Sequence, residues 1–319
     1  MIAETLSGQT RPSSARWGEG LSVLLGLVLT APLYMSSFAE FAGAWNADSA
    51  YLFGHLIVPL ALAAGAATWL RLRPHPAIEL SPLDLRRGLR LLLAGVIAHF
   101  VAFCFHNLAV DVFGLILIVR GIIVACAGYE TLRRYDFPTL FLALLIPVTL
   151  PSDFFPTLTA ALQHFVAFSS AAVIDLIGVP VFRDGLDLRF GELTLTVDAV
   201  RSGLAVWQGV LACCLFAGFV SGHGLLYRIT LALLSLPIAA LTQSLGLIVA
   251  GILFHWRGLA AADEFIHNFH GRLPLLFAVG LTVATALALH ALAVGLDNAA
   301  NCVRSVAARM PRQWKGSAA

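Results

Sequence analysis

Long runs of apolar residues constrain the fold of this chain more than any other feature. A helix needs roughly 20 mostly apolar residues to cross the ~30 Å hydrocarbon core of a bilayer. Soluble domains are about 45–50% apolar and about 25% charged, whereas this chain is 59% apolar and 12% charged. The sequence therefore predicts one all-α polytopic membrane domain with about eight transmembrane helices. The expected spans are 21–39, 51–70, 88–110, 112–128, 138–150, 203–222, 227–254 and 273–296.

The fifth of these runs is short for a span. It has 13 residues, contains Pro147 and is followed by Pro151, whereas a straight crossing needs at least ~17 residues. The next stretch, 154–177, is apolar but carries polar side chains, which are Gln163, His164 and Asp175. We expect this stretch to form an interfacial or re-entrant helix rather than a ninth span.

Arginine and lysine are distributed unequally between alternate loops. With eight crossings and a cytoplasmic amino terminus, fourteen of the 20 lie inside and five outside, with Arg120 within a span. Because cytoplasmic loops carry the excess, we expect both ends in the cytoplasm, as in a bacterial inner-membrane protein. The expected organisation is a cytoplasmic tail (1–20), a transmembrane domain (21–296) with outer loops 151–202 and 255–272, and a cytoplasmic tail (297–319).

The first run has an alternative interpretation. Arg16 precedes it and the small residues Ala42, Gly43 and Ala44 follow it, which is also the pattern of a secretory signal peptide. Cleavage there would leave the topology of the remaining spans unchanged.

The remaining composition excludes several classes of protein. Twenty Lys and Arg against 18 Asp and Glu leave a formal charge of +2, which provides no basic surface for nucleic acid. The five cysteines show neither Cys-x-x-Cys nor zinc-type spacing, so we expect no disulfide, no metal and no cofactor. The partner that the composition itself implies is the lipid bilayer.

The loop 151–202 contains a stretch of alternating apolar and polar residues. The alternation runs from Val179 to Val197, with turn residues at Asp184-Gly185 and at Gly191. A period of two punctuated by turn residues is typical of short strands. We therefore expect a small β-like insertion on the outer face, where the polar residues are concentrated and where we place any chemistry.

A series of short motifs begins at Pro147. They are Leu162-Gln163, then Gly178-Val179-Pro180-Val181-Phe182-Arg183-Asp184-Gly185, then Ser202-Gly203-Leu204, then Pro237 with Gln243, and finally His267-Asn268-Phe269-His270-Gly271. In this order they resemble the exosortase/archaeosortase family, multi-spanning membrane proteins that process carboxy-terminal sorting signals on exported proteins. The resemblance covers about 140 residues, and the first 140 residues match in hydropathy alone.

The resemblance implies an active site with a cysteine, an arginine and a histidine. The cysteine belongs to a Glu-Ala-Cys-Ser-Gly segment. Alignment on Ser202-Gly203 places Arg201 at the cysteine, and alignment on Asp198-Ala199 places Val200 there. In either alignment the thiol is missing.

Of the other two family positions, the arginine is missing and the histidine is present. The family arginine follows an asparagine, and here Gln243 stands at the asparagine and Gly246 at the arginine. His267, four residues before Gly271, matches the family histidine. The chemistry needs a thiolate nucleophile, a base and a cation that holds the oxyanion, so the resemblance predicts a member without cysteine transpeptidase activity.

The sequence offers a cysteine pair and a serine as substitutes for the missing nucleophile. Cys213 and Cys214 lie about 15 Å along a helix from the motif at 1.5 Å per residue, which is too far. Ser202 is an oxygen nucleophile that His267 would serve as base, although a serine before glycine at a helix start is more often a capping residue. An active enzyme with unorthodox residues therefore remains an alternative function.

Several polar residues have both a structural and a functional interpretation. Arg120 within a span marks either an ion pair, which we favour, or a polar cavity. Arg201 either snorkels at a span boundary or is a fixed cation that binds a carboxylate or phosphate. For His267 and His270, which lie near Asp263 and Glu264, a solvated loop is favoured over a metal site.

Three functions follow from these residues. The favoured hypothesis is an exosortase-like protein that binds a protein sorting signal, a membrane-anchored client or an envelope or exopolysaccharide assembly subunit on its outer face. The second is the active enzyme already described, and the third is a transporter component built around Arg120. The residues expected to bind the partner are Asp198, Arg201, Ser202, Gln243 and Arg120, with His267 as the catalytic candidate.

Overall fold

The computed structural model describes residues 13–47, 54–71, 81–146, 154–197, 204–269 and 273–309, and most of them are helical. The elements are α1 (Ser13–Thr30), η1 (Ala31–Tyr34), α2 (Met35–Ala47), α3 (Gly54–Arg71), α4 (Pro82–Phe105), α5 (Leu108–Ala127), α6 (Tyr129–Arg134), α7 (Asp136–Phe141), η3 (Leu142–Leu145), α8 (Phe154–Leu176), β1 (Phe182–Asp184), β2 (Asp187–Phe190), β3 (Leu193–Thr196), α9 (Leu204–Val220), α10 (Leu225–Arg257), α11 (Leu259–Phe269) and α12 (Leu273–Arg309).

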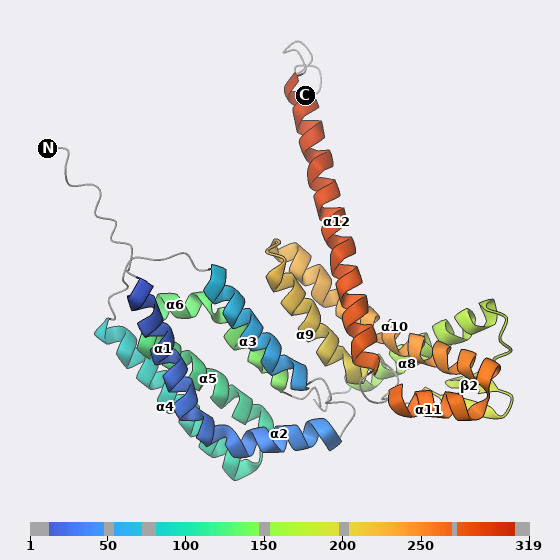
Figure 1. Ribbon diagram of the computed structural model, residues 1–319, viewed down its shortest axis with the longest axis horizontal. Coiled ribbons are helices and arrows are strands. Elements are labelled where there is room, and N and C mark those ends of the chain that lie inside the picture. The colour runs from blue at the N-terminus through green and yellow to red at the C-terminus, as the bar shows by residue number, and fades with distance from the viewer. Residues whose placement is uncertain are drawn as a thin grey trace.

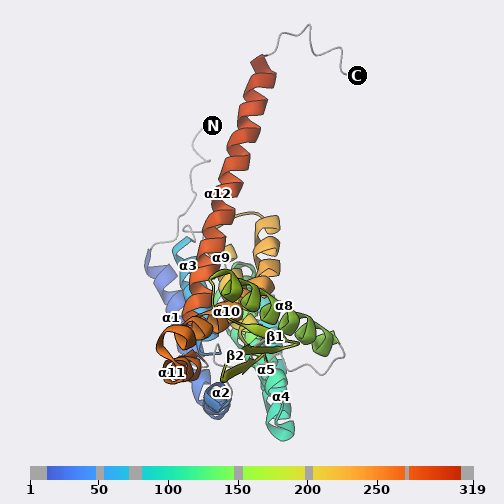
Figure 2. The same ribbon diagram turned by 90° about the vertical axis from the view of Figure 1, so that its right-hand side faces the viewer.

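The helices form a bundle with a small sheet at one side (Figure 1). The start of α1 and the end of α12 point to one side, and the sheet and α11 lie at the opposite side (Figures 1 and 2). We call this opposite side the sheet side. The number of crossings and the side of the membrane on which each end lies stay predictions.

Six helices in the described ranges are long and apolar enough to cross a membrane. They are Ser22–Gly43, Pro82–Phe105, Leu108–Ala127, Pro156–Leu176, Leu225–Arg257 and Leu276–Gly295, and shorter apolar helices lie at Asp136–Leu145 and Val206–Val220. Together with the apolar side chains that α4 exposes, such as Leu93, Ile97 and Phe100, these helices make the chain an all-α polytopic membrane protein. The bilayer is its solvent.

Three of the expected spans are not among these six: 51–70, and also 138–150 and 203–222, which correspond to the two shorter apolar helices. The helix expected at 51–70 is α3, which is described from Gly54; it contains His55, Thr68 and Arg71 and is not among the six. Conversely, α8 is long and apolar enough to cross. In both views, however, α8 runs steeply across the direction of α12 (Figures 1 and 2). Its interfacial or re-entrant placement therefore stays a prediction.

The helices α4 and α5 form a tightly packed antiparallel pair. Ser81 caps α4, since its side chain accepts a hydrogen bond from the Leu83 amide, and Asn107 caps α5 by accepting from the amides of Ala109 and Val110. Such caps satisfy the free amides of a first helical turn. Between the helices the chain turns at His106, whose φ is 49°, so the two axes run back along each other.

Glycines at matching levels bring the backbones of α4 and α5 together. A Cβ added at Gly95 would lie 2.9 Å from the Gly114 carbonyl oxygen, and one at Gly121 would lie 3.0 Å from the Gly88 carbonyl oxygen. Seven residues separate Gly88 from Gly95 and Gly114 from Gly121. Small residues of this kind allow close helix packing in lipid, where hydrophobic association is weak.

The alternating stretch folds as predicted into three antiparallel strands in the order β1-β2-β3. In the strand register, Asp184 lies opposite Asp187 and Phe190 lies opposite Leu193. Each connection between strands is therefore a two-residue hairpin loop. Gly185 and Gly191 stand first in these loops with φ of 62° and 59°. Two-residue hairpins favour turns with positive φ at this position, which glycine adopts without strain.

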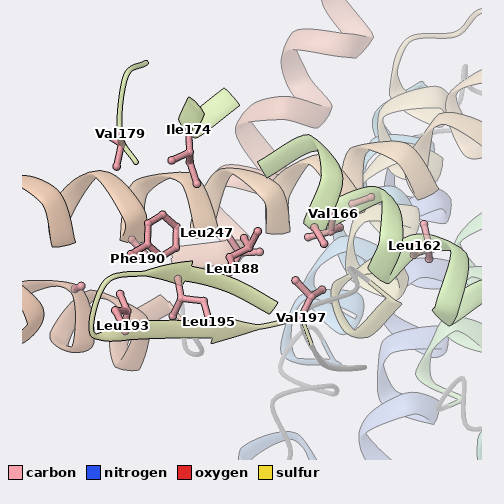
Figure 3. Close-up of a cluster of buried hydrophobic side chains, with 14 residues drawn as sticks. Leu162, Val166, Ile174, Val179, Leu188, Phe190, Leu193, Leu195, Val197 and Leu247 are labelled. Atoms are coloured by element: carbon pink, nitrogen blue, oxygen red, sulfur yellow. The ribbon is translucent and has the colours of Figure 1, made fainter. Parts of the chain in front are cut away.

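One face of the sheet is buried against the helices. Leu188, Phe190, Leu193 and Leu195 alternate with exposed residues and join a hydrophobic core between α8, α10 and α11. Figure 3 shows Leu188 and Phe190 beneath α10, with Val166 of α8 beside them. Phe190 packs so closely on α10 that a Cβ at Gly251 would lie 2.9 Å from its ring. The β insertion therefore packs against the helices and shares their hydrophobic core.

Fusion reporters are expected to locate the two sides of the bundle. Reporters after Gly191 and after Ala262 should report the outer side, and one after Ala319 the cytoplasm, because the arginine and lysine excess predicts both ends inside. A pair of reporters active on opposite sides of the membrane, such as alkaline phosphatase and a fluorescent protein, measures this directly. A cytoplasmic reading after Gly191 would contradict both the orientation and the outward site.

Candidate functional site

The motif segment of the resemblance lies between β3 and α9. Asp198, Arg201 and Ser202 lie outside the described residues, which end at Val197 and resume at Leu204. His270 and Gly271, between α11 and α12, also lie outside them. The proximity of Arg201 to His267 therefore remains a prediction, and the described residues on either side define the frame around the segment.

The residue before the motif segment is held firmly in place. Val197 is fully buried in the core beneath α10. Its amide donates to the Leu186 carbonyl at 3.0 Å, and its carbonyl accepts from Gln163 Nε2 of α8 at 3.2 Å. Gln163, part of the Leu162-Gln163 motif, thus connects α8 to the last fixed residue before Asp198.

A second glutamine holds the chain on the other side of the motif segment. Gln208 lies one turn into α9, and its Nε2 donates to the carbonyls of Leu144 and of Ile146, the latter at 2.8 Å. Ile146 is the last described residue before the proline-containing link to α8. Gln208 was not among the residues predicted from the sequence, although a glutamine within the otherwise apolar helix Leu204–Val220 is a sign of a polar contact.

Gln243 lies in the buried half of α10. It is 7% exposed. Its neighbour Ser244 exchanges a hydrogen bond of 2.9 Å with Ser169 of α8, and Ser170 Oγ donates to the Ser244 carbonyl. Gln243, which the resemblance aligns with a family asparagine, thus lies beside the α8–α10 contact.

His267 lies in the last turn of the amphipathic helix α11. Ala262, Phe265 and Ile266 face the core, and His267 is exposed together with Asp263 and Glu264. Within the described ranges, no group of three or more His, Cys, Asp or Glu side chains is arranged to hold a metal ion. In both views α11 lies at the sheet side, near the start of α12 (Figures 1 and 2).

Val197, the α8–α10 contact beside Gln243 and the helix α11 that carries His267 thus belong to the core around the sheet or border it. A family model described as Transmembrane exosortase (Exosortase_EpsH) matches residues 45–285. The chain belongs to the exosortase family. No curated protein and no solved structure matches it. The exosortase match begins at residue 45, so it extends over α3 to α7, where the sequence analysis found similarity in hydropathy alone.

The cysteines of this exosortase-family chain lie within helices rather than in the motif segment. Cys104 lies in α4, Cys126 in α5, and Cys213 with Cys214 in the middle of α9. Cys214 is fully buried, where it packs with Val210 and Ala278. A thiol packed in this way behaves as a small apolar side chain.

Arg120 has charged and polar partners inside the exosortase-family bundle. Its Nη2 lies 2.7 Å from Asp136 Oδ1, and its Nη1 donates to Thr139 Oγ1 at 3.1 Å. No partner for Arg120 could be identified from the sequence, and the structure shows that its partner is Asp136. The ion pair ties α5 to α7.

Proposed function

We propose that this exosortase-family protein binds a membrane-anchored client or an envelope assembly subunit on its outer face and does not carry out cysteine transpeptidation. The observation that carries the proposal is the residue at the nucleophile position, which is Arg201 or Val200 in the two alignments. Neither side chain is able to form the thioester on which acyl transfer by a thiolate depends. A sorting signal of an exported protein is the ligand that the family suggests.

The described frame supports a binding role for the motif segment. Gln163 and the buried Val197 position the chain immediately before Asp198, and α9 begins immediately after Gly203. A guanidinium at position 201 keeps its charge at any physiological pH and binds two oxygens of one carboxylate. The segment therefore suits recognition of an anionic group on the client, with His267 as the neighbouring polar residue.

The missing arginine supports the same proposal independently. Gly246 stands at the position of the family arginine, and it is buried in α10. Glycine provides no cation to stabilise an oxyanion, and losing one donor of this kind alone costs roughly 10²–10³ in rate. Loss of both the nucleophile and the oxyanion cation is consistent with a retained fold and an abandoned reaction.

Removal of all five cysteines tests the proposal. A variant with Cys104, Cys126, Cys213, Cys214 and Cys302 changed to alanine or serine should bind a co-expressed client with unchanged affinity, because no thiol takes part. Binding is measured by site-specific photo-crosslinking in the native membrane at matched protein levels, and client cleavage is followed in the same samples. The control is Ser202→Ala in the wild-type background.

Two results would contradict the proposal. Client cleavage that one cysteine substitution abolishes would show a thiol nucleophile outside the aligned position. Client cleavage that Ser202→Ala abolishes would instead establish the alternative of an active enzyme with a serine nucleophile and His267 as base.

A further inference from the structure

A polar cavity lies at the turn between α4 and α5, and none of its lining residues belongs to the motif segment. It has a volume of about 110 Å³, is partly open to the surface, and is lined by the start of α2, the end of α4, the turn that follows and the start of α5. A cavity of this size holds several waters or one small organic group. Its α2 residues precede residue 45, where the exosortase match begins, so this cavity is built partly from chain that the family model does not cover.

The centre of the cavity is an aspartate–histidine pair. His99 Nδ1 lies 2.7 Å from Asp111 Oδ1, and Asp111 is 5% exposed. A neutral imidazole that donates from Nδ1 to a carboxylate keeps Nε2 as an acceptor. One oxygen of Asp111 and one nitrogen of His99 thereby remain without a partner in the described part of the chain.

Two further acceptors line the same cavity. Ser37 is 8% exposed and lines the cavity. Glu40 contributes a carboxylate without an ion-pair partner in the same ranges. Buried polar groups normally have partners, so a largely buried serine hydroxyl close to the Asp111 carboxylate in one cavity favours a ligand that donates hydrogen bonds.

The charges of the lining residues select the sign of that ligand. Two carboxylates, Asp111 and Glu40, face the cavity with the imidazoles of His99 and His106, and no arginine or lysine is among the described residues that line it. An anion would meet two like charges there. A primary ammonium group has three donors and no acceptor, which complements a cavity that offers acceptors and negative charge.

We propose that this cavity binds a primary ammonium group. Asp111 is the buried counter-ion, His99 orients it, and Ser37 and Glu40 accept the remaining hydrogen bonds. His99 lies about 9 Å from the end of α4, and Asp111 lies about 5 Å from the start of α5, at 1.5 Å per residue. This is the depth at which lipid headgroups meet the hydrocarbon core, so the ammonium belongs either to an aminophospholipid or to a soluble or peptide amine.

The experiment uses the full chain and has one arm for each source. In the soluble arm, ethanolamine is titrated against the thermal unfolding midpoint of detergent-purified protein, with choline and inorganic phosphate at equal ionic strength. In the lipid arm, the protein is placed in nanodiscs of equal parts phosphatidylethanolamine, phosphatidylcholine and phosphatidylglycerol, and the retained lipid is counted by native mass spectrometry. Choline headgroups carry the same charge but no N–H, so they test hydrogen bonding itself.

The expected result is a preference for the primary amine of roughly tenfold over its choline analogue. A preference in the lipid arm identifies a headgroup as the source, and a preference in the soluble arm alone identifies a free or peptide amine. Asp111→Asn and Glu40→Gln should each abolish it, whereas Glu130→Gln, an exposed carboxylate in α6, should leave it unchanged. If Asp111→Asn fails to fold, Glu40→Gln, on the exposed rim, still decides the outcome.

Three outcomes would overturn the assignment. They are equal retention of ethanolamine and choline in both arms, tighter binding of phosphate than of ethanolamine, and an unchanged preference in Glu40→Gln. None of them bears on the client-binding proposal, because neither Asp111 nor Glu40 belongs to the motif region.

Discussion

Replacing Gly95 with leucine is expected to force α4 away from α5 and to cause the largest loss of stability of any single change considered for this protein. A Cβ at Gly95 would lie 2.6 Å from Ile118 Cγ1 and 2.9 Å from both the Gly114 carbonyl oxygen and the Ile118 amide nitrogen. Two of these three atoms are backbone and cannot rotate aside. Overpacking typically costs about 1–3 kcal/mol and occasionally more, and contact with rigid backbone places this change at about 3 kcal/mol or above.

The free energy of unfolding in a detergent titration measures this loss. The matched control is Gly65→Leu in α3, where a Cβ meets no atom within 4 Å, so the same substitution in a helix interior should be nearly neutral or slightly stabilising. Similar losses in both variants would show that leucine disturbs these helices for a reason other than packing. An unchanged Gly95→Leu variant would contradict the close α4–α5 contact itself.

Arg201→Ala is expected to weaken client binding roughly tenfold or more if the proposed function holds. A hydrogen bond to a charged group contributes about 1.5–3 kcal/mol, and a tenfold change in affinity corresponds to about 1.4 kcal/mol. Arg201→Lys should recover part of the affinity, since an ammonium keeps the charge but cannot bind both oxygens of a carboxylate in the planar geometry of a guanidinium. Client binding for both variants is compared at matched membrane levels.

The alternative role of Arg201 gives a different pattern. If Arg201 only snorkels at a span boundary, lysine should replace it fully, and alanine should change insertion or stability without changing affinity. Equal binding by the wild type and both variants would end the proposed role. So would a separation of more than about 15 Å between Arg201 and His267, because hydrogen-bond reach is only about 3 Å from each side chain.

The sheet shows which features of this fold are readable from sequence. Its strands were predicted because their determinants are local, namely the alternation that buries Leu188 and Leu195 and the glycines at the two turns. The determinants of the long spans are also local, because the hydropathy of each stretch identifies its span independently of the others. Five of the six membrane-length helices coincide with expected spans.

Features that depend on pairing between elements were not predictable in this way. Arg120 finds Asp136 because α6 turns the chain back towards α5, whereas the sequence placed Asp136 just outside a span. The spacing of Gly88 with Gly95 and of Gly114 with Gly121 is visible in the sequence, but only the antiparallel packing shows that the two pairs meet. The contact of His99 with Asp111 depends on the same packing.

In the candidate site too, residue identities were readable from the sequence, whereas contacts between elements were not. Gln163 was noted in the sequence, yet its hydrogen bond to Val197 depends on how α8 crosses beneath α10. Gln208 carried a signal, an amide within an apolar helix, that was available and not used. The arrangement of Asp198, Arg201 and Ser202 relative to His267 lies outside the described residues and stays a prediction from the family resemblance.

The length of α12 has a mechanical consequence for the carboxyl end of the protein. Its apolar window ends at Gly295 while the helix continues to Arg309, which adds about 20 Å of rod at 1.5 Å per residue. This length exceeds twice the Debye length of about 8 Å at physiological salt. Charges at the end of α12 are therefore largely screened from the charges of the lipid surface. Because the helix extends this far beyond its apolar window, a small tilt at the base of α12 displaces its end by a larger distance.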